Sequence, residues 1–327
     1  MMRRVLVTGG AGFIGSHTCK ALAAAGIEPI TLDNLESGHR DAVRWGPLVV
    51  ADIADRTAVA TTIAQYEPEA VIHFAAYAYV GESVSDPSKY YRNNVAGTIA
   101  LLDACRSADV RSVVFSSTCA TYGAPSVLPI VEATPQQPIN PYGRTKLMVE
   151  QILADQAEAY GLRYVALRYF NACGADPDGE IGERHSPETH LIPRALMAAA
   201  GALPTLQVFG DDYPTPDGTC IRDYIHVSDL ARAHVLALEH LRRGGENLAV
   251  NLGTGRGTSI REIVGAIRRI TAREVPLSFE ARRVGDPPSL YADPTLARER
   301  LGFVAQYSDV DTIVRTSAPF FGLEAVS

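Results

Sequence analysis

The first half of the chain alternates short, nearly continuous apolar runs with longer stretches of mixed character. Apolar runs bounded by glycine and polar residues indicate strands covered on both faces, and the longer stretches indicate helices. The expected strands are Val5–Thr8, Pro29–Asp33, Leu48–Asp52, Ala70–Ala75, Ser112–Ser117 and Tyr164–Tyr169. The expected helices are 13–25, 55–66, 88–108 and 143–160. This order predicts βαβ units, and therefore an α/β fold with a Rossmann-type, doubly wound parallel sheet.

The alternation ends after Asn171. Residues 172–190 are polar and rich in glycine and proline, which predicts a loop. Further helices are expected at 191–200, 228–242 and 259–271, and a strand at Leu248–Leu252. The length of 327 residues suits two domains. We expect a dinucleotide-binding domain of residues 1–171 plus about 225–255, and a smaller mixed α/β substrate-binding domain of 172–224 plus about 256–327.

Composition narrows the class of protein. Apolar residues make up 46% of the chain and the net charge is −7, as in a globular protein that does not bind nucleic acid generally. The five cysteines are odd in number and lack C-x-x-C spacing, which favours reduced thiols in a cytoplasmic protein and no metal site. No apolar run is long enough to cross a membrane, so no membrane contact is expected.

A glycine-rich turn follows the first expected strand. The spacings Gly10-x-Gly12-x-x-Gly15 and Gly9-x-x-Gly12-x-x-Gly15 both fit a loop that lets backbone N–H groups approach a pyrophosphate at a helix N-terminus. Asp33 ends the next strand, where a carboxylate accepts hydrogen bonds from the adenosine ribose and repels a 2′-phosphate. The pattern therefore predicts a dinucleotide site that prefers NAD to NADP; the plainer alternative is a tight turn without a ligand.

Asp52 has two interpretations of equal weight. With Ile53 it could hold the adenine edge, because it ends the third expected strand. A helical stretch follows, so Asp52 could instead be the N-cap of that helix.

Tyr142 and Lys146 are four residues apart at the start of an expected helix, so they share one helix face. A free phenol has a pKa of about 10 and is a poor base near neutral pH. A nearby ammonium and a positively charged nicotinamide both favour the phenolate and lower that pKa. Thr118, at the end of the fifth expected strand, offers a hydroxyl that could bridge Tyr142 and substrate. The plainer alternatives are an exposed helix face and a capped strand end.

Several longer motifs carry a family resemblance. The segments TGGAGFIGSH, DNLESGH, VIHFAA, VGES, YYRNNV, FSST, NPYGRTKLMVEQ, LRYFNACGA, RDYIHVSDLA and RRVGD occur in this order across residues 5–286. Together they resemble the UDP-glucose 4-epimerases of the extended short-chain dehydrogenase/reductase superfamily. The loop GEIGERHSPETHLIP is similar to bacterial members tied to exopolysaccharide synthesis, and to relatives acting on UDP-xylose. The resemblance implies an NAD-dependent isomerase that interconverts UDP-glucose and UDP-galactose through a transient 4-keto sugar.

The resemblance also implies roles for individual residues. Tyr142 is similar to the catalytic base, Lys146 to its electrostatic partner, and Thr118 to the third member of the triad. The positions similar to NAD contacts are Gly9, Gly12, Phe13, Ile14, Gly15, Asp33, Asn34, Asp52, Ile53, Phe74, Ala75, Ala76, Asn94, Ser116, Tyr142, Lys146 and Phe170. The positions similar to UDP-sugar contacts are Thr118, Tyr142, Asn171, His190, Leu191, Phe209, Arg222, Arg283, Asp286 and Leu290.

Arg222 and Arg283 suit a diphosphate, because its charged oxygens need cationic, fork-shaped donors. Salt bridges on the protein surface are the plainer alternative for both arginines.

Family members resembling this chain form homodimers through the helices expected at 88–108 and 143–160. Leu147, Met148, Ile152 and Leu153 make the second of these more apolar than one sheet-facing stripe requires. Extra core burial explains the same residues equally well.

The chain departs from the family pattern at two positions. Ala78 stands where some relatives carry a lysine that reaches NAD, and Leu290 stands where stricter relatives carry a tyrosine beside the sugar 2-substituent. The smaller leucine leaves UDP-N-acetylglucosamine open as a substrate, and UDP-xylose or UDP-arabinose is a further alternative.

Other functions of the same fold fit less well. Sugar-nucleotide dehydratases need a carboxylate pair after the threonine, where this chain has Cys119 and Ala120. A simple dehydrogenase would release reduced cofactor in each cycle, and only the resemblance argues against it. A non-catalytic NAD-sensing protein would not need Thr118, Tyr142 and Lys146 together.

Overall fold

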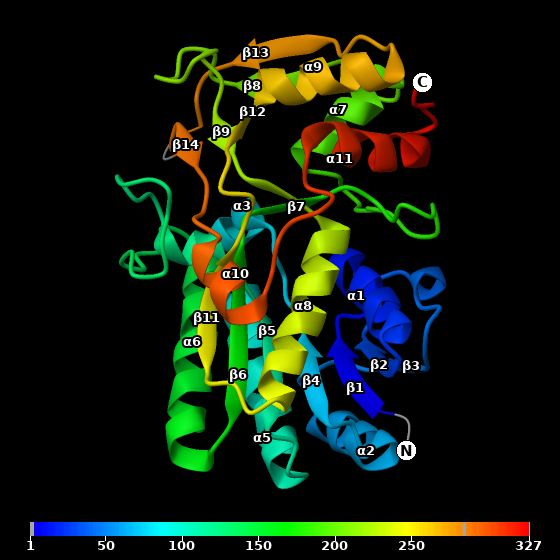
Figure 1. Ribbon diagram of the computed structural model, residues 1–327, viewed down its shortest axis with the longest axis vertical. Coiled ribbons are helices and arrows are strands. Elements are labelled where there is room, and N and C mark those ends of the chain that lie inside the picture. Colours follow the sequence, from blue (N-terminus) through cyan, green and yellow to red (C-terminus); the bar gives the residue numbers. More distant parts are fainter. Residues whose placement is uncertain (1–2, 284–285, 327) are drawn as a thin grey trace.

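The computed structural model describes residues 3–283 and 286–326. Its centre is a seven-stranded sheet in the order β11-β6-β5-β4-β1-β2-β3, with every neighbouring pair parallel (Figure 1). Its strands are β1 (Arg3–Thr8), β2 (Ile27–Asp33), β3 (Leu48–Val50), β4 (Ala70–His73), β5 (Ser112–Thr118), β6 (Arg163–Tyr169) and β11 (Leu248–Leu252). The predicted Rossmann-type, doubly wound sheet is confirmed.

Helices cover both faces of this sheet. They are α1 (Phe13–Ala24), α2 (Arg56–Tyr66), α5 (Thr98–Ser107), α6 (Pro141–Tyr160) and α8 (Val227–Arg242). Val5 and Val7 of β1 pack in one core with α1 and α8, whereas Leu6 packs in a second core with α2, α5 and α6. Side chains alternate between the faces of a strand, so burial of both faces explains why the strand reads as an unbroken apolar run.

A smaller mixed unit lies beyond the carboxyl ends of the sheet strands (Figure 1). Its helices are α7 (Leu191–Ala199), α9 (Ile260–Thr271) and α11 (Val310–Ser317), and its strands are β8 (Leu206–Phe209), β9 (Ile221–Arg222), β12 (Thr258–Ser259), β13 (Leu277–Glu280) and β14 (Ser289–Leu290). Strand β8 pairs with β13, and β9 lies between β12 and β14. A separate apolar core joins these helices. The boundaries of the two predicted domains stay a prediction.

Short elements connect the two parts. Strands β7 (Asn171–Cys173) and β10 (Tyr224–His226) pair with each other, and α10 (Thr295–Leu301) lies beside β11. The predicted loop 172–190 therefore begins inside β7, but it contains no other helix or strand. None of the helices in the described parts of the chain is both long and apolar enough to cross a membrane.

The prediction of one continuous helix at 88–108 is wrong in detail. The segment divides into α4 (Pro87–Tyr90), a π-helix (Tyr91–Gly97) and α5, and it follows a short helix α3 (Val80–Ser85). The π-helical turn carries the buried Asn94, whose amide bonds both backbone groups of Tyr77 and the hydroxyl of Thr145. Tertiary hydrogen bonds, rather than a local sequence signal, therefore accompany the wider turn, which is a frequent feature of functional sites.

Two predicted strands end earlier than expected. Strand β4 stops at His73 because the N–H groups of Phe74 and Ala75 both donate to the carbonyl oxygen of Thr8. Strand β3 stops at Val50, so Asp52 lies beyond the strand rather than at its end.

Candidate active site

The glycine turn forms a close-fitting cradle between β1 and α1. A Cβ atom on Gly9 would lie 2.7 Å from the backbone nitrogen of Ala75, and one on Gly15 would lie 2.2 Å from the carbonyl oxygen of Gly9. Gly12 is the N-cap of α1 and makes no side-chain cap, and the first turn of α1 contains no acidic residue. The first-turn N–H groups of α1 are thus suited to a phosphate.

Asp33 closes the other side of this cradle. Its carboxylate accepts hydrogen bonds from the backbone N–H of Ala11 at 3.0 Å and of Leu35 at 2.9 Å. Burial raises the pKa of Asp33, and these two N–H donors offset only part of the rise. The side chain is held at the end of β2 next to Gly38, as a ribose ligand requires.

Asp52 does not cap α2. The N-cap is Asp55, whose carboxylate accepts hydrogen bonds from Thr57 and Ala58. Asp52 instead accepts hydrogen bonds from the side chain of Asn34 at 3.0 Å and from the backbone of Ala54 at 2.8 Å. The capping alternative is therefore wrong, and Asp52 lies beside the end of β2.

The remaining predicted NAD positions gather at the same edge of the sheet. Except for Ser116 and Asn94, they follow the carboxyl ends of sheet strands or begin α1, which is where open α/β sheets bind ligands. These positions are Phe13 and Ile14 at the start of α1, Ile53 after β3, Phe74, Ala75 and Ala76 after β4, Ser116 in β5, and Phe170 after β6; Asn94 lies in the π-helix.

Tyr142 and Lys146 lie on the first turns of α6. The helix begins after Asn140, whose side chain accepts a hydrogen bond from Gly143 N–H at 2.8 Å, with Pro141 at the first helical position. The Lys146 ammonium lies 6.0 Å from the centre of the Tyr142 ring. The Nζ atom donates a hydrogen bond to the backbone oxygen of Ser116 at 2.7 Å. The predicted partners are therefore together.

Thr118 completes this group at the end of β5. Its hydroxyl oxygen accepts a hydrogen bond from Ala120 N–H at 3.1 Å, so it does cap the following turn. A hydrogen bond with the same hydroxyl opposes the rise that burial causes in the pKa of Tyr142. Capping and a role beside Tyr142 are thus compatible, because the hydroxyl keeps a proton to donate.

Burial dominates the protonation of the two side chains in the protein chain itself. It raises the pKa of Tyr142 to about 12, although Thr118 opposes the rise. It lowers the pKa of Lys146 to about 7, although the carboxylate of Glu150 opposes the fall. In the chain itself burial therefore outweighs any lowering of the Tyr142 pKa by Lys146, and the combined effect of the ammonium and a nicotinamide stays a prediction.

A buried ion pair supports α6 and was not found by sequence reasoning. Glu150, one helical turn after Lys146, pairs with Arg168 of β6 at 2.6 Å, and both side chains are 7% exposed. Arg168 also donates to the hydroxyl of Tyr122 at 2.7 Å, and Ser117 donates to Glu150. The four-residue spacing of Lys146 and Glu150 can be read from the sequence. Arg168, the partner of Glu150, lies on strand β6 and cannot be paired with it by spacing.

The predicted substrate residues gather in two groups on the smaller unit and its border. Leu290 and Phe170 pack in one apolar cluster with Cys119, the residue after Thr118. Leu290 also pairs with Arg222 across β14 and β9. These contacts join the edge of the sheet that carries Thr118 to strand β9, which carries the predicted diphosphate ligand Arg222.

Arg222 and Arg283 differ in their surroundings. The Arg222 side chain is 13% exposed and pairs with Asp286, so it is not a surface salt bridge. The exposed Arg283 places its guanidinium 4.0 Å from the centre of the Phe209 ring. This pair offers a flat face and positive charge together.

The other three predicted substrate positions border this area. The side chain of Asn171 donates to the backbone oxygen of Asp223 at 3.0 Å. His190 and Leu191 mark the start of α7, where the side chain of His190 turns towards Glu183 and Glu188. Sequence reasoning assigned no role to these two glutamates, although they share a short polar segment with His190.

Comparisons with known proteins agree with this geometry. Residues 5–253 match the NAD dependent epimerase/dehydratase family. A UDP-glucose 4-epimerase of Rhizobium leguminosarum bv. trifolii is 54% identical over 313 residues, covering 96% of this chain and 95% of the relative. The crystal structure of UDP-glucose 4-epimerase from Brucella ovis in complex with NAD is 69% identical, with a TM-score of 0.98 and coverage of 99% of this chain and 100% of that one.

A third relative was solved with a sugar nucleotide. It is a UDP-glucose-4-epimerase from Stenotrophomonas maltophila with bound NAD and formylated UDP-arabinopyranose. It is 42% identical, with a TM-score of 0.95 and coverage of 98% of both chains. This chain therefore belongs to the NAD dependent epimerase/dehydratase family.

Proposed function

We propose that this protein is an NAD-dependent 4-epimerase that interconverts UDP-glucose and UDP-galactose through a transient 4-keto sugar. The observation that carries the proposal is the grouping of Tyr142, Lys146 and Thr118 at the sheet edge that also holds the glycine cradle. Relatives that match nearly the whole chain carry this activity in their names.

NAD fits the residues present at the cradle. Gly9, Gly12 and Gly15 would admit the pyrophosphate, and Asp33 would accept hydrogen bonds from the adenosine ribose. When bound, NAD⁺ supplies the acceptor for the hydride that leaves C4 of the sugar and later returns to it. Because the cycle is redox-neutral, the cofactor has no need to leave between turnovers.

Tyr142 would move the proton. Its phenolate oxygen accepts the proton of the 4-hydroxyl group, directly or through the hydroxyl of Thr118. Lys146 stabilises the phenolate by charge while the Ser116 carbonyl holds its ammonium in place. Return of the same proton to the 4-keto oxygen completes the reaction. Cys119 and Ala120, which follow Thr118, provide no carboxylate for a dehydration.

The smaller unit would anchor the UDP group while the sugar turns between its two faces. Arg222 and Arg283 would hold the diphosphate, and the Phe209–Arg283 pair offers a flat surface to the base. The other ligands that we propose are Asn171, His190, Leu191, Asp286 and Leu290.

Leu290 favours a wider range of sugars. It packs with Phe170 at the border of the catalytic edge, where a tyrosine would occupy more space. UDP-N-acetylglucosamine is therefore a second candidate substrate, and a pentose sugar nucleotide is a third because the Stenotrophomonas maltophila relative holds formylated UDP-arabinopyranose.

The proposal includes a homodimer through α6 and the neighbouring π-helix and α5. Met148 is 39% exposed and the half-buried Leu147 precedes it, whereas the half-buried Ile152 packs against the core of the sheet. Leu153 is only 1% exposed and packs in the core of the sheet. For Leu153, burial in the core is therefore the correct explanation of its apolar side chain, and not a dimer interface. The exposed apolar face is thus narrower than the sequence pattern indicated.

Purified protein incubated with UDP-galactose tests the function. We expect UDP-glucose to form without added cofactor, and UDP-N-acetylglucosamine and UDP-xylose tested in parallel will rank the substrates. Protein that retains NAD but converts none of these sugar nucleotides would contradict the epimerase and support a sensing protein instead.

A further inference from the structure

Four side chains from one short segment converge before α7. They are Glu183, His185, Glu188 and His190, and their ligand atoms all lie within 4.8 Å of one another. The segment is part of the loop between β7 and α7. It reads E-x-H-x-x-E-x-H, and the proposed epimerase reaction assigns no role to three of its four members.

The distances match those between ligands of one small cation. Nδ1 of His190 lies 2.8 Å from Glu183 Oε1 and 3.1 Å from Glu188 Oε1. Nδ1 of His185 lies 3.3 Å from Glu183 Oε1 and 3.4 Å from Glu188 Oε2. In a tetrahedral site with bonds of about 2.0–2.2 Å, neighbouring ligand atoms lie about 3.3–3.6 Å apart. The two His185 distances fall in this range, and the two His190 distances are slightly shorter.

Two of these atoms have no hydrogen-bond partner within the described residues. They are Glu183 Oε1 and His185 Nδ1, and both are shielded from solvent. The Glu183 side chain is only 5% exposed and its oxygen is directed at the two imidazole rings. A buried carboxylate without a proper donor is costly, and a bound cation would satisfy the oxygen and the ring nitrogen together.

A neighbouring acidic cluster differs from this one because a lysine neutralises its carboxylates. Asp176, Asp178 and Glu180 surround the ammonium of Lys20, with distances of 2.8, 2.6 and 2.6 Å. No described lysine or arginine comes within 4 Å of the Glu183 or Glu188 carboxylate, whose ion-pair partners are the two histidines alone. The positive charge here must therefore come from imidazolium rings or from an ion.

The ring centres of His185 and His190 are 4.9 Å apart. Burial lowers the pKa of both rings, but the carboxylates of Glu183 and Glu188 raise it overall, to about 9 for His185 and about 10 for His190. A bound ion must therefore displace the ring protons, and each neutral imidazole then supplies a lone pair in place of a positive charge.

We propose that Glu183, His185, Glu188 and His190 form a binding site for a divalent transition-metal ion, with Zn²⁺ as the best match. Zn²⁺ accepts mixed imidazole and carboxylate ligands in a tetrahedral arrangement. Mg²⁺ and Ca²⁺ prefer oxygen ligands, which two imidazoles do not provide. The sequence expectation of no metal site rested on cysteine spacing, which says nothing about a site built from histidine and glutamate.

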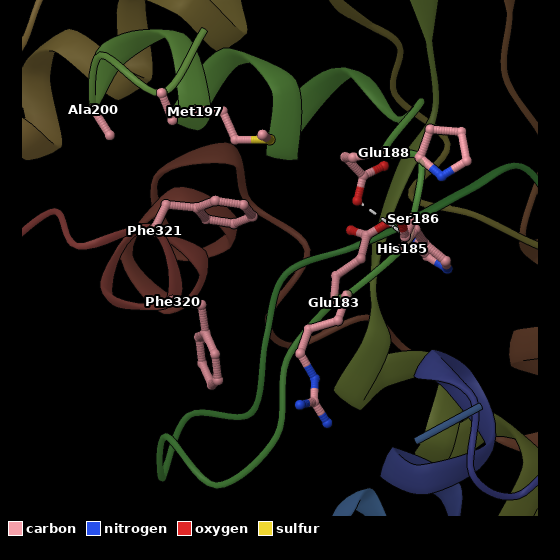
Figure 2. Close-up of a pocket in the computed structure, with 11 residues that line it drawn as sticks. Glu183, His185, Ser186, Glu188, Met197, Ala200, Phe320 and Phe321 are labelled. Carbon is pink, nitrogen blue, oxygen red and sulfur yellow. Dashed lines mark ion pairs between the residues drawn. The ribbon is translucent and has the colours of Figure 1, made fainter. Parts of the chain in front are cut away.

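The site borders a cavity of about 630 Å³. Figure 2 shows Glu183, His185 and Glu188 on one side of this cavity, opposite Met197, Phe320 and Phe321. The cavity gives an ion a route to the ligands, and the bound ion would fix the loop against the start of α7. A metal on Nδ1 of His190 would also leave the ring proton on Nε2, as a donor to substrate; this consequence alone rests on the proposed function.

Metal binding to the full-length protein tests the site. Protein purified with its bound cofactor is treated with a chelator, dialysed, and titrated with Zn²⁺ and then with Co²⁺. We expect one tightly bound ion per chain, measured by elemental analysis, and the intense visible absorption of tetrahedral Co²⁺. Glu183→Gln should weaken Zn²⁺ binding by more than about 100-fold, because loss of even an outer ligand partner costs about 10–100-fold.

Glu180→Gln is the matched control, since it changes a glutamate of the same loop that Lys20 neutralises. It should bind the ion as the wild type does. His185→Asn provides a second test should Glu183→Gln fail to fold. Wild-type protein that binds no Zn²⁺ or Co²⁺ at micromolar concentration would overturn the proposal and leave an ion-pair cluster. Equal binding by wild type, Glu183→Gln and His185→Asn would overturn it as well.

Discussion

The ammonium of Lys146 donates a hydrogen bond of 2.7 Å to the backbone carbonyl oxygen of Ser116. This bond ties the first turns of α6 to the end of β5 and buries the lysine, which is 3% exposed. Burial lowers the pKa of Lys146 to about 7 while Glu150 opposes the change. The position therefore favours a neutral amine in the folded chain and holds an ammonium only with help from nearby negative charge.

The first prediction concerns stability and pH. The pKa of Lys146 falls from 10.5 in the unfolded chain to about 7 in the folded chain, so the unfolded chain binds more protons between these values. The contribution of Lys146 to stability must therefore rise with pH across this window, by at most about 1.4 kcal/mol per pH unit. We expect wild type to gain stability relative to Lys146→Met between pH 7 and 9.

Urea unfolding of both proteins, freed of dinucleotide, measures this difference. Lys146→Met should be the more stable protein near pH 6, where the buried ammonium is most costly, yet the less active one. The difference to follow is the free energy of unfolding of wild type minus that of Lys146→Met. If this difference stays constant or falls as the pH rises, Lys146 is not held near its neutral form.

The second prediction concerns the dinucleotide. We propose that the Asp33 carboxylate, which Ala11 and Leu35 hold at the glycine turn, would meet a ribose 2′-phosphate, and the proposed reaction regenerates its cofactor. Denatured wild-type protein should therefore release NAD, and native protein should need none added. Asp33→Asn should purify with less NAD and recover activity when NAD is supplied. Release of NADP, or activity that depends on added NADP, would rule out this role for Asp33.

Leu290 provides the third prediction, on sugar selectivity. Replacing leucine by tyrosine in the cluster with Phe170 and Cys119 should narrow the space beside the sugar. Pockets that differ by a small group discriminate by about 10–200-fold, so Leu290→Tyr should lower kcat/KM for UDP-N-acetylglucosamine within that range relative to UDP-glucose. An unchanged ratio of the two kcat/KM values would show that residue 290 does not limit the size of the sugar substituent.

The fourth prediction concerns the homodimer. Light scattering should give the mass of a dimer at micromolar concentration. Met148→Asp should shift the protein towards a monomer, because it places a charge on the apolar face of α6. Ala60→Asp, an exposed change on α2, is the control and should leave the mass unchanged. A monomeric wild type would contradict the proposed interface.

The sheet and its ligand edge were predictable because both follow from local patterns. The apolar runs of β1, β2, β5 and β6 and the glycine turn report burial and backbone geometry directly. The smaller unit was less accessible, since β9, β12 and β14 have two residues each and exist only through pairing between distant segments. Pairing of that kind leaves no periodic signal in the chain.

The candidate site also has features that could be predicted from the sequence and features that could not. Tyr142, Lys146 and Thr118 could be predicted to lie together because their residue types and spacing indicate one kind of chemistry, and the structure brings them together. The Glu150–Arg168 pair was missed because an ion pair between a helix and a strand depends on tertiary packing. Desolvation of Tyr142 was missed for the same reason, since burial cannot be read from the spacing of two residues.

The most direct test of the proposed mechanism is the turnover of Tyr142→Phe with UDP-galactose. Removing the phenolic oxygen should lower kcat by about 10²–10⁴-fold, because the proton acceptor is lost while the ring remains. NAD content and thermal stability should stay close to those of wild type, which separates lost chemistry from lost folding. A Tyr142→Phe protein that retains NAD and turns over at nearly the wild-type rate would contradict the account.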